Sequence, residues 1–280
     1  MRQPTKRAAT ILLSILAAAA AFALVHPTPS RASRFDTLPS VVLWAWERPE
    51  DLRFLEPKRT AVAFLAETIT LPSTSKPPVI QTRLQPLRVS PEIPLIAVVR
   101  IENPAGRTSQ AAASLAPEFR SRLATEITRV QSLPVVRGIQ IDFDATTSEH
   151  DFYSALLEDI RRQIRPDIHL SITALASWCI GDTWLDALPS GTIDEAVPML
   201  FRMGVDRANV ANFLRSHDAF PVAACNTSLG LSTDETLSRS ILTGQSSNTF
   251  ASRSEKRIYI FAPHPWTEHD TNPILQELHR

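Results

Sequence analysis

Two carboxylates end a strongly apolar stretch in the middle of the chain. The sequence GIQIDFD occupies residues 138–144, with Asp142 and Asp144 two positions apart. Successive side chains of a β-strand point to opposite faces, so the isoleucines and the phenylalanine share one face while Gln140, Asp142 and Asp144 share the other. The stretch therefore predicts a buried strand with one apolar face and one acidic face.

Paired acids of this kind can serve as a general acid and its electrostatic partner. Two neighbouring carboxylates repel each other, and burial adds to the cost of ionising both, so the pKa of one of them rises. We expect Asp144 to hold the proton and Asp142 to stay ionised beside it. The alternative is a structural role, in which Arg100, Arg137 or Arg202 neutralises the pair in a salt-bridge network.

Tryptophans, arginines and further acids stand near the ends of the other apolar stretches. Tryptophan faces stack on pyranose rings, while carboxylates and guanidinium groups hydrogen-bond to sugar hydroxyls. Glycosidase chemistry adds an acid that protonates the leaving oxygen. We therefore expect a carbohydrate-binding rim, in which Arg202 suits an anionic sugar and His264 has a structural role as its alternative. The expected members are Trp46, Glu47, Glu67, Arg100, Glu102, Trp178, Met199, Arg202, His264 and Trp266.

Composition and motifs argue against several other functions. Lysine plus arginine and aspartate plus glutamate both number 29, so no net basic field attracts nucleic acid. The sequence has no HExxH or paired CxxC spacing, no P-loop, no GxGxxG and no GxSxG, and it has only 7 glycines. We expect a carbohydrate ligand, and we expect no metal, no cofactor and no nucleic-acid partner.

Apolar, β-rich stretches alternate with stretches of helical spacing, which is typical of a parallel sheet. Eight such strands predict a closed barrel, an α/β fold of the (β/α)8 TIM-barrel type in a single domain. The active site of such a barrel lies at the carboxyl ends of its strands, where the residues above occur. The expected strands are 41–46, 61–71, 94–102, 136–144, 168–178, 195–203, 225–232 and 257–266. The expected helices are 112–133, 149–164, 182–188, 206–217, 234–243 and 272–279.

The region after the second strand departs from this alternation. Six prolines lie between residues 72 and 94. Proline interrupts helices and central strands, because it lacks a backbone N–H donor. We expect an irregular, proline-rich excursion or hairpin there, in place of one barrel helix.

The amino terminus has the features of an export signal. Basic residues precede an apolar run at 8–25, and the small residues of SRAS follow at 30–33. We expect residues 1–32 to be a cleaved signal peptide and residues 33–280 to be the barrel domain, periplasmic or secreted. The alternative is an uncleaved anchor that holds the domain on the periplasmic side of the inner membrane, since a spanning helix needs about 20 apolar residues.

Cys179 and Cys225 are the two cysteines of the chain. In an oxidising compartment they can form one disulfide. The alternative is a pair of buried apolar thiols, because free cysteine is commonly a small core residue.

The acidic strand resembles a motif of a known enzyme family. GIQIDFD is similar to the DGxDxDxE strand of glycoside hydrolase family 18, the chitinase-like barrels, in which the motif closes the fourth strand. The resemblance places Asp142 on the last aspartate of the motif and Asp144 on the catalytic glutamate. It implies a TIM barrel with its site at the end of that strand.

A second point of resemblance lies in PMLFRM, which is similar to the MxYD of that family. Met199 matches, Phe201 replaces the tyrosine and Arg202 replaces the aspartate. Trp266 stands where the family has the tryptophan that closes the eighth strand. In that family the substrate's acetamido group is the nucleophile, steadied by the tyrosine and the aspartate. Phe201 has no hydroxyl and Arg202 reverses the charge, so the resemblance implies the fold and the place of the site but not this mechanism.

A further resemblance covers most of the domain. The stretches VVLWAWERPEDLRFL, GIQIDFDA, LSITALASWC and DEAVPMLFRMG are similar to a bacterial family of exported proteins of undefined function. This resemblance supports the domain boundaries and implies no substrate.

Three functions follow from these patterns. The first is a glycoside hydrolase or related carbohydrate-active protein that acts on an envelope or environmental glycan, with Asp144 as general acid and Asp142 as its partner. The second is a non-catalytic glycan-binding barrel, which Phe201 and Arg202 favour. The third is an envelope interaction protein whose polar rim only stabilises the barrel.

Overall fold

Eight parallel strands form a closed barrel in the computed structural model, which describes residues 38–72, 77–104, 117–182, 184–243 and 256–279. The strands are β1 (Val41–Ala45), β3 (Thr60–Thr70), β6 (Leu95–Glu102), β7 (Val136–Asp142), β8 (His169–Leu175), β9 (Glu195–Met199), β10 (Ser228–Ser232) and β11 (Arg257–Phe261). They pair in the order β1-β3-β6-β7-β8-β9-β10-β11, and the pairing of β11 with β1 closes the ring. The predicted (β/α)8 TIM-barrel fold in one domain is confirmed.

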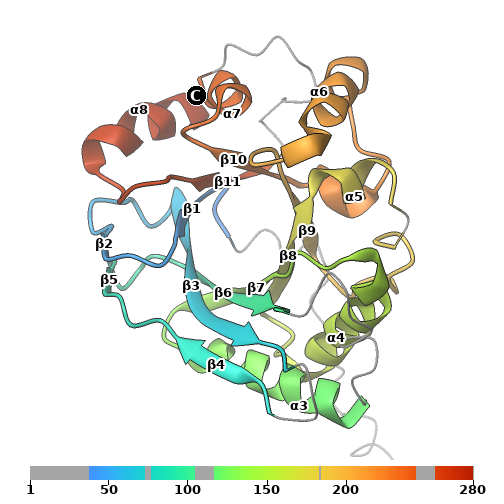
Figure 1. Cartoon of the computed structure of the whole chain (residues 1–280). Helices are drawn as coiled ribbons and strands as arrows, with labels where there is room; N and C mark the ends of the chain where they lie inside the picture. The colour runs from blue at the N-terminus through green and yellow to red at the C-terminus, as the bar shows by residue number, and fades with distance from the viewer. Residues whose placement is uncertain (1–37, 73–76, 105–116, 183, 244–255, 280) are drawn as a thin grey trace, which may run out of the picture.

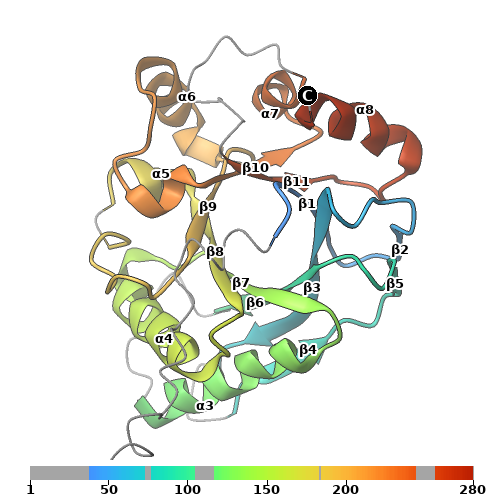
Figure 2. The ribbon, with the colours of Figure 1, turned by 180° about the vertical axis from the view of Figure 1, so that it is seen from behind.

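Helices form the outer layer, and from β6 onward one α-helix follows each strand of the barrel (Figures 1 and 2). Short 3-10 turns join some of these elements. The α-helices are α3 (Pro117–Thr128), α4 (His150–Gln163), α5 (Ala176–Ile180), α6 (Arg207–Ser216), α7 (Thr236–Leu242) and α8 (Glu268–Leu278). The 3-10 helices are η1 (Arg129–Ser132), η2 (Thr147–Glu149), η3 (Gly204–Asp206) and η4 (Ala223–Asn226).

The proline-rich excursion is confirmed and takes the place of a barrel helix. It contains β4 (Val79–Thr82), which pairs antiparallel with β3, and β5 (Leu87–Arg88), which pairs with β2 (Glu50–Asp51). These short strands lie on the side of the barrel between α8 and α3 (Figure 1). All four residues of β4 are exposed, so this side is closed by backbone pairing more than by an apolar helix face.

Several predicted elements have different ends in the structure. The predicted strand 168–178 ends at Leu175, because the chain enters α5 at the next residue. The predicted strand 257–266 ends at Phe261, before two prolines that cannot donate to a ladder. The predicted helix 182–188 is wrong: the described residues there form turns. Residues 112–116 of the first predicted helix lie outside the described residues.

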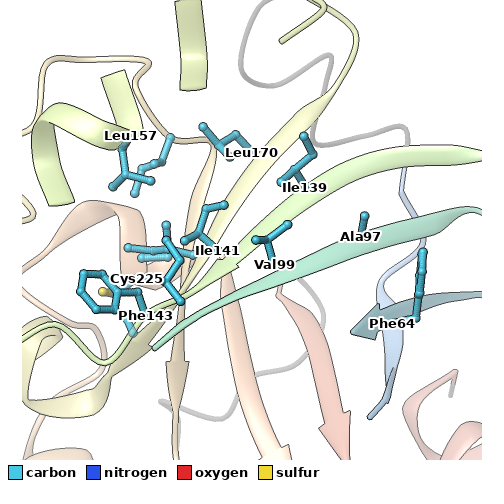
Figure 3. Close-up of a cluster of buried hydrophobic side chains, with 14 of the residues drawn as sticks. Phe64, Ala97, Val99, Ile139, Ile141, Phe143, Leu157, Leu170 and Cys225 are labelled. Atoms are coloured by element: carbon cyan, nitrogen blue, oxygen red, sulfur yellow. The ribbon is translucent and has the colours of Figure 1, made fainter. Parts of the chain in front are cut away.

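Alternate strand residues face two separate cores, as the period of two predicts. Ile139, Ile141 and Phe143 belong to the outer core between barrel and helices. Figure 3 shows Ile139 and Ile141 beside Val99 and Leu170 of the neighbouring strands, with Leu157 of α4 in the same cluster. This core explains why β7 is so apolar on one face.

The inner core fills the barrel and is partly polar. Its apolar members include Val42, Trp44, Ile96, Val98 and Tyr259, all buried. These side chains form a packed interior, and the cleft described below lies above them at the mouth.

A buried charged network closes the amino-terminal end of the barrel. The Glu195 carboxylate accepts hydrogen bonds from Arg257 at 2.9 Å and from the Tyr259 hydroxyl, and His169 Nε2 lies 3.4 Å away. Burial alone would raise the pKa of Glu195, but Arg257 and His169 outweigh it and hold this pKa below its usual value. The paired charges thus stay ionised inside the barrel.

Cys179 in α5 and Cys225 in η4 form a disulfide, with their Cα atoms 5.9 Å apart. Of the two alternatives for the cysteines, the structure has the bonded pair. The bond joins the segment after β8 to the segment before β10, across the position of β9.

The predicted signal segment, residues 1–32, lies outside the described residues. Among the residues that are described, no helix has both the length and the apolar character needed to cross a bilayer.

Candidate active site

A cleft of about 500 Å³ opens at the carboxyl ends of the barrel strands. Strands β1, β6, β7, β8, β9 and β11 contribute side chains to it. Its walls mix aromatic, charged and small side chains. It is lined by Trp44, Trp46, Arg100, Asp142, Asp144, Thr173, Leu175, Ala176, Ser177, Met199, Phe201, Arg202, Met203, Gly204, Val205, Asp206 and Phe261. The position is the one at which barrels of this architecture place their active sites.

Asp142 is the deeper acid of the cleft. It is the last residue of β7, it is partly buried, and it accepts a hydrogen bond from Thr173 Oγ1 at 2.7 Å. Burial raises its pKa to about 6; Thr173 and Arg100 oppose this rise, while Asp144 and Glu102 add to it. Near neutral pH this carboxyl therefore exchanges a proton readily, as a catalytic acid or base must.

Asp144 reaches the open side of the cleft. Its side chain is exposed, and it lies two residues beyond Asp142 on the same face of the chain. Partial desolvation raises its pKa, and the nearby Arg100 lowers it. Burial thus raises the pKa of both carboxyls, and the charge of Asp144 adds to the rise at Asp142.

The loop that carries Asp144 is fixed from behind by Glu149. The Glu149 carboxylate accepts hydrogen bonds at 2.8 Å from both the backbone N–H and the hydroxyl of Thr146. Asn103 Nδ2 donates to its other oxygen. This capping box joins the end of β7 to the start of α4 and limits how far Asp144 can move.

A polar ladder lies beneath the acids. Trp44 Nε1 donates to Gln140 Oε1 at 2.7 Å, and Gln140 Nε2 donates to Ser171 Oγ at 3.3 Å. The Trp44 indole lies so close to Gly230 that a Cβ at that position would be 3.1 Å from its Cη2 atom. Glycine at this position therefore lets the indole fill the floor of the cleft.

Aromatic rings and arginines form the walls. The Arg100 guanidinium lies 5.9 Å from the Trp46 ring centroid and pairs with Glu102 at 3.2 Å. On the other wall, Phe201 and Phe261 stack with their ring centroids 5.7 Å apart. The Arg202 guanidinium lies 4.8 Å from the Phe261 ring centroid.

The structure brings six of the predicted site residues to the cleft. They are Trp46, Arg100, Asp142, Asp144, Met199 and Arg202. Glu102 lies beside them through its ion pair with Arg100.

The remaining predicted residues do not line the cleft. Trp178 is buried on α5, because β8 ends before it, and its ring centroid lies 5.1 Å from that of Trp184. Trp266 is buried beyond the end of β11, and its Nε1 donates to the Trp44 carbonyl at 2.9 Å. Both tryptophans pack in the core, so neither has a ring face free for a sugar.

The other three predicted residues that lie outside the cleft are polar. Glu67 points outward from β3 towards Glu126 and Arg129, and desolvation raises its pKa. Glu47 and His264 are exposed on loops outside the lining of the cleft. Trp178, His264 and Trp266 belong to predicted strands that extend past the observed ends of β8 and β11. Glu67, in contrast, lies within β3 and faces outward.

Sequence reasoning missed Thr173, Phe261 and Val205 as parts of the cleft. Thr173 and Phe261 lie on the inward faces of β8 and β11, so correct strand ends and the alternation of faces would have found both. Val205 is 95% exposed in η3, after β9, and no sequence pattern distinguishes it.

In the part of the chain that the structure describes, no three His, Cys, Asp or Glu side chains are grouped as metal ligands.

Fold and site together define a (β/α)8 barrel with a carboxylate pair at the end of β7. Residues 91–203 match the family described as "Domain of unknown function (DUF3142)", so the expected resemblance to a family of undefined function is confirmed. The matched segment begins just before β6 and includes the acid pair and Arg202. No curated protein matches the sequence.

Solved structures similar to this chain include three bacterial proteins. A family GH18 chitinase from Chromobacterium violaceum is 10% identical over 92% of this chain and 91% of its own, with a TM-score of 0.49. The Bacillus cereus spore cortex-lytic enzyme SleL is 13% identical over 70% and 51%, with a TM-score of 0.48. The chitinase domain of the Clostridium difficile spore coat protein CotE is 18% identical over 57% and 49%, with a TM-score of 0.40. This chain thus spans about half the length of the last two.

Proposed function

We propose that this protein is a glycoside hydrolase or a related carbohydrate-active enzyme that acts on an envelope or environmental glycan. The observation that carries the proposal is the acid pair: Asp142 and Asp144 both line a cleft with aromatic walls, and burial raises the pKa of each. Hydrolysis of a glycosidic bond needs a protonated acid that reaches the leaving oxygen and an ionised group that stabilises or attacks the sugar cation. Indole and phenyl rings supply the faces on which pyranose rings stack.

In the proposed reaction Asp144 is the general acid, because it is the carboxyl that reaches the open side of the cleft. It donates its proton to the leaving oxygen as the glycosidic bond breaks. Asp142, which is held by Thr173 and is ionised above its pKa of about 6, stabilises the positive charge that develops on the sugar ring. Water then adds to the anomeric carbon and returns one proton to Asp144, so that the acid pair is restored.

The cleft does not favour a mechanism in which an acetamido group of the substrate attacks. Phe201 is buried against Phe261 and offers no hydroxyl, and Arg202 offers no negative charge. Substrates without an acetamido group are therefore compatible with the proposal, and the attacking water needs only the two acids.

The test is hydrolysis of a panel of bacterial and plant polysaccharides by the full chain and two variants. Asp144→Asn keeps the size of the side chain but removes its acid, and we expect activity to fall by about 100-fold or more, the usual contribution of general acid catalysis. Asp186→Asn, an exposed aspartate outside the cleft, is the matched control and should retain full activity. Hydrolysis that survives Asp144→Asn unchanged would rule out the proposed roles.

A non-catalytic glycan-binding barrel is the second candidate, favoured by Phe201 and Arg202 at positions where the resembling enzymes carry catalytic partners. Binding of a glycan without cleavage, lost on Trp46→Ala, would support this candidate. If the protein neither binds nor cleaves any of these glycans, the remaining candidate is an envelope interaction protein.

We also propose that residues 1–32 export the protein and that residues 33–280 work in the periplasm or outside the cell. The apolar run at 8–25 and the disulfide support export, since disulfides persist in oxidising compartments. Mass spectrometry of the protein recovered from periplasmic and membrane fractions tests the idea: cleavage near residue 32 indicates a signal peptide, and an intact amino terminus in the membrane fraction indicates an anchor.

A further inference from the structure

One wall of the cleft carries a positive charge that the proposed acid pair does not use. The Arg202 guanidinium lies 4.8 Å from the ring centroid of Phe261, which stacks on Phe201. The other cleft arginine, Arg100, is already paired with Glu102 at 3.2 Å. Among the residues that the structure describes, no carboxylate forms an ion pair with the Arg202 guanidinium.

The order of the strands separates this charge from the acids. Asp142 ends β7, whereas Arg202 follows β9, and β8 lies between them. Phe261, over which the guanidinium lies, ends β11 still further round the barrel. The guanidinium therefore leans away from the acid pair, and a sugar placed against the acids can extend a neighbouring unit to Arg202.

The backbone holds Arg202 in a conformation that most residues avoid. Its φ is 51°, in the left-handed region, where a residue with a side chain is strained. Its N–H donates to Glu235 Oε1 at 2.6 Å, and Arg207 Nη2 pairs with the other oxygen of that carboxylate at 3.1 Å. Strain of this kind persists where the surrounding structure fixes it, and it is common at ligand-binding positions.

We propose that Arg202, lying on Phe261, forms a subsite for the carboxylate of an acidic sugar. The proposal rests on the proposed function and names its substrate class: a glycan with carboxyl groups. A planar guanidinium binds a carboxylate through two parallel hydrogen bonds, a geometry that a lysine cannot reproduce. The phenyl ring of Phe261 supports the guanidinium, and the exposed Val205 of the adjacent η3 adds an apolar contact for the sugar ring.

Calorimetric titration of the full chain with two matched pairs of oligosaccharides tests the subsite. One pair is oligogalacturonate and the same oligomer with its carboxyls reduced to hydroxymethyl groups. The other is an oligosaccharide containing N-acetylmuramic acid and a chitooligosaccharide of equal length, which lacks the lactyl carboxylate. The two pairs distinguish a uronic acid from a lactyl ether as the source of the carboxylate.

We expect the acidic member of at least one pair to bind at least about tenfold more tightly than its neutral partner, as a charge-assisted hydrogen bond provides. Arg202→Gln should abolish this preference and leave the neutral ligand unaffected, and Arg202→Lys should restore only part of it. Arg215→Gln, on the exposed surface of α6, should keep the preference.

Three results would overturn the subsite: equal affinity within both pairs, no binding by any member, or a preference that survives Arg202→Gln. Hydrolysis is measured in parallel with Asp144→Asn, so the two proposals can fail separately. Arg202-dependent binding without cleavage removes the enzyme and keeps the subsite. Cleavage of neutral glycans, with no tighter binding of the acidic oligosaccharides, removes the subsite and keeps the enzyme.

Discussion

Asp142 is a carboxyl whose ionisation opposes folding. Its pKa rises from 3.8 to about 6 in the folded protein, chiefly because of burial, so the folded state binds this proton more tightly than the unfolded state does. The resulting stability is fully present below the unfolded pKa of about 4 and falls as the pH rises towards 6. Above that window the folded protein carries the whole penalty of a buried, ionised carboxylate.

Replacing Asp142 with asparagine should remove this penalty. We expect Asp142→Asn to be more stable than the wild type at pH 8 by about 3 kcal/mol, with the difference vanishing below about pH 4. Urea denaturation at the two pH values measures both differences. Asp51→Asn is the control of opposite sign, because the hydrogen bond from Arg53 lowers the pKa of Asp51 to about 2. A less stable Asp142→Asn protein at pH 8 would show that the ionised carboxylate is stabilised.

Two buried tyrosines offer a matched comparison of hydroxyl groups. The Tyr153 hydroxyl has no hydrogen-bond partner among the described residues, whereas that of Tyr259 donates to Glu195. A buried polar group without a partner costs about 1–3 kcal/mol, and the loss of a charge-assisted hydrogen bond costs a similar amount. Tyr153→Phe should therefore raise the free energy of unfolding by about 1 kcal/mol, and Tyr259→Phe should lower it by about 2 kcal/mol. Equal effects of the two changes in urea denaturation would contradict this assignment.

At the scale of residues, the sequence predicted the acid pair well and the aromatic wall poorly. Period-two alternation assigned Gln140, Asp142 and Asp144 to the inner face correctly, since a short apolar strand leaves no other register. Trp178 and Trp266 were expected at the rim and are core residues. Their ring chemistry suits both places, and only the positions of the strand ends decide between them.

At the scale of elements, the type of each strand followed from its sequence, but its end did not. The helix expected at 149–164 is α4, in which Phe152, Leu156 and Ile160 recur at four-residue intervals and are all buried. Strand ends depend on where the chain turns to meet the next helix, which is a tertiary property that local hydrophobicity does not record. The loop between β7 and α4 is the element on which the proposed chemistry depends most.

Glu149 should control both the stability and the precision of that loop. Glu149→Ala removes a capping box together with the contact to Asn103, and we expect a loss of about 1–2 kcal/mol in the free energy of unfolding. Glu158→Ala is the control, because its ion pair with Arg162 on the surface of α4 is worth only a few tenths, about 0.3–0.5 kcal/mol. Urea denaturation measures both. Losses of equal size would show that the carboxylate of Glu149 does not fix the loop.

At the scale of the whole molecule, the count of strands and their alternation with helices were enough to predict a closed parallel barrel. The closure itself, through β11 and β1, joins segments more than two hundred residues apart and has no local signal. The proline-rich excursion shows the same limit: its sequence excluded a helix, but its pairing with β2 and β3 is a property of the folded barrel.

The disulfide between Cys179 and Cys225 acts at this scale, because it ties α5 to the segment before β10 across a sequence separation of 46 residues. A cross-link over such a distance restricts the unfolded chain and stabilises the native state by about 2–4 kcal/mol. Urea denaturation with and without reductant should show a loss of that size in the wild type. The double variant Cys179→Ser and Cys225→Ser should have the stability of the reduced wild type in both conditions. It should not respond to reductant, since the chain has no other cysteine. A wild type whose midpoint is the same in both conditions would show that the bond does not constrain the unfolded chain, and the barrel would then depend on its packing alone.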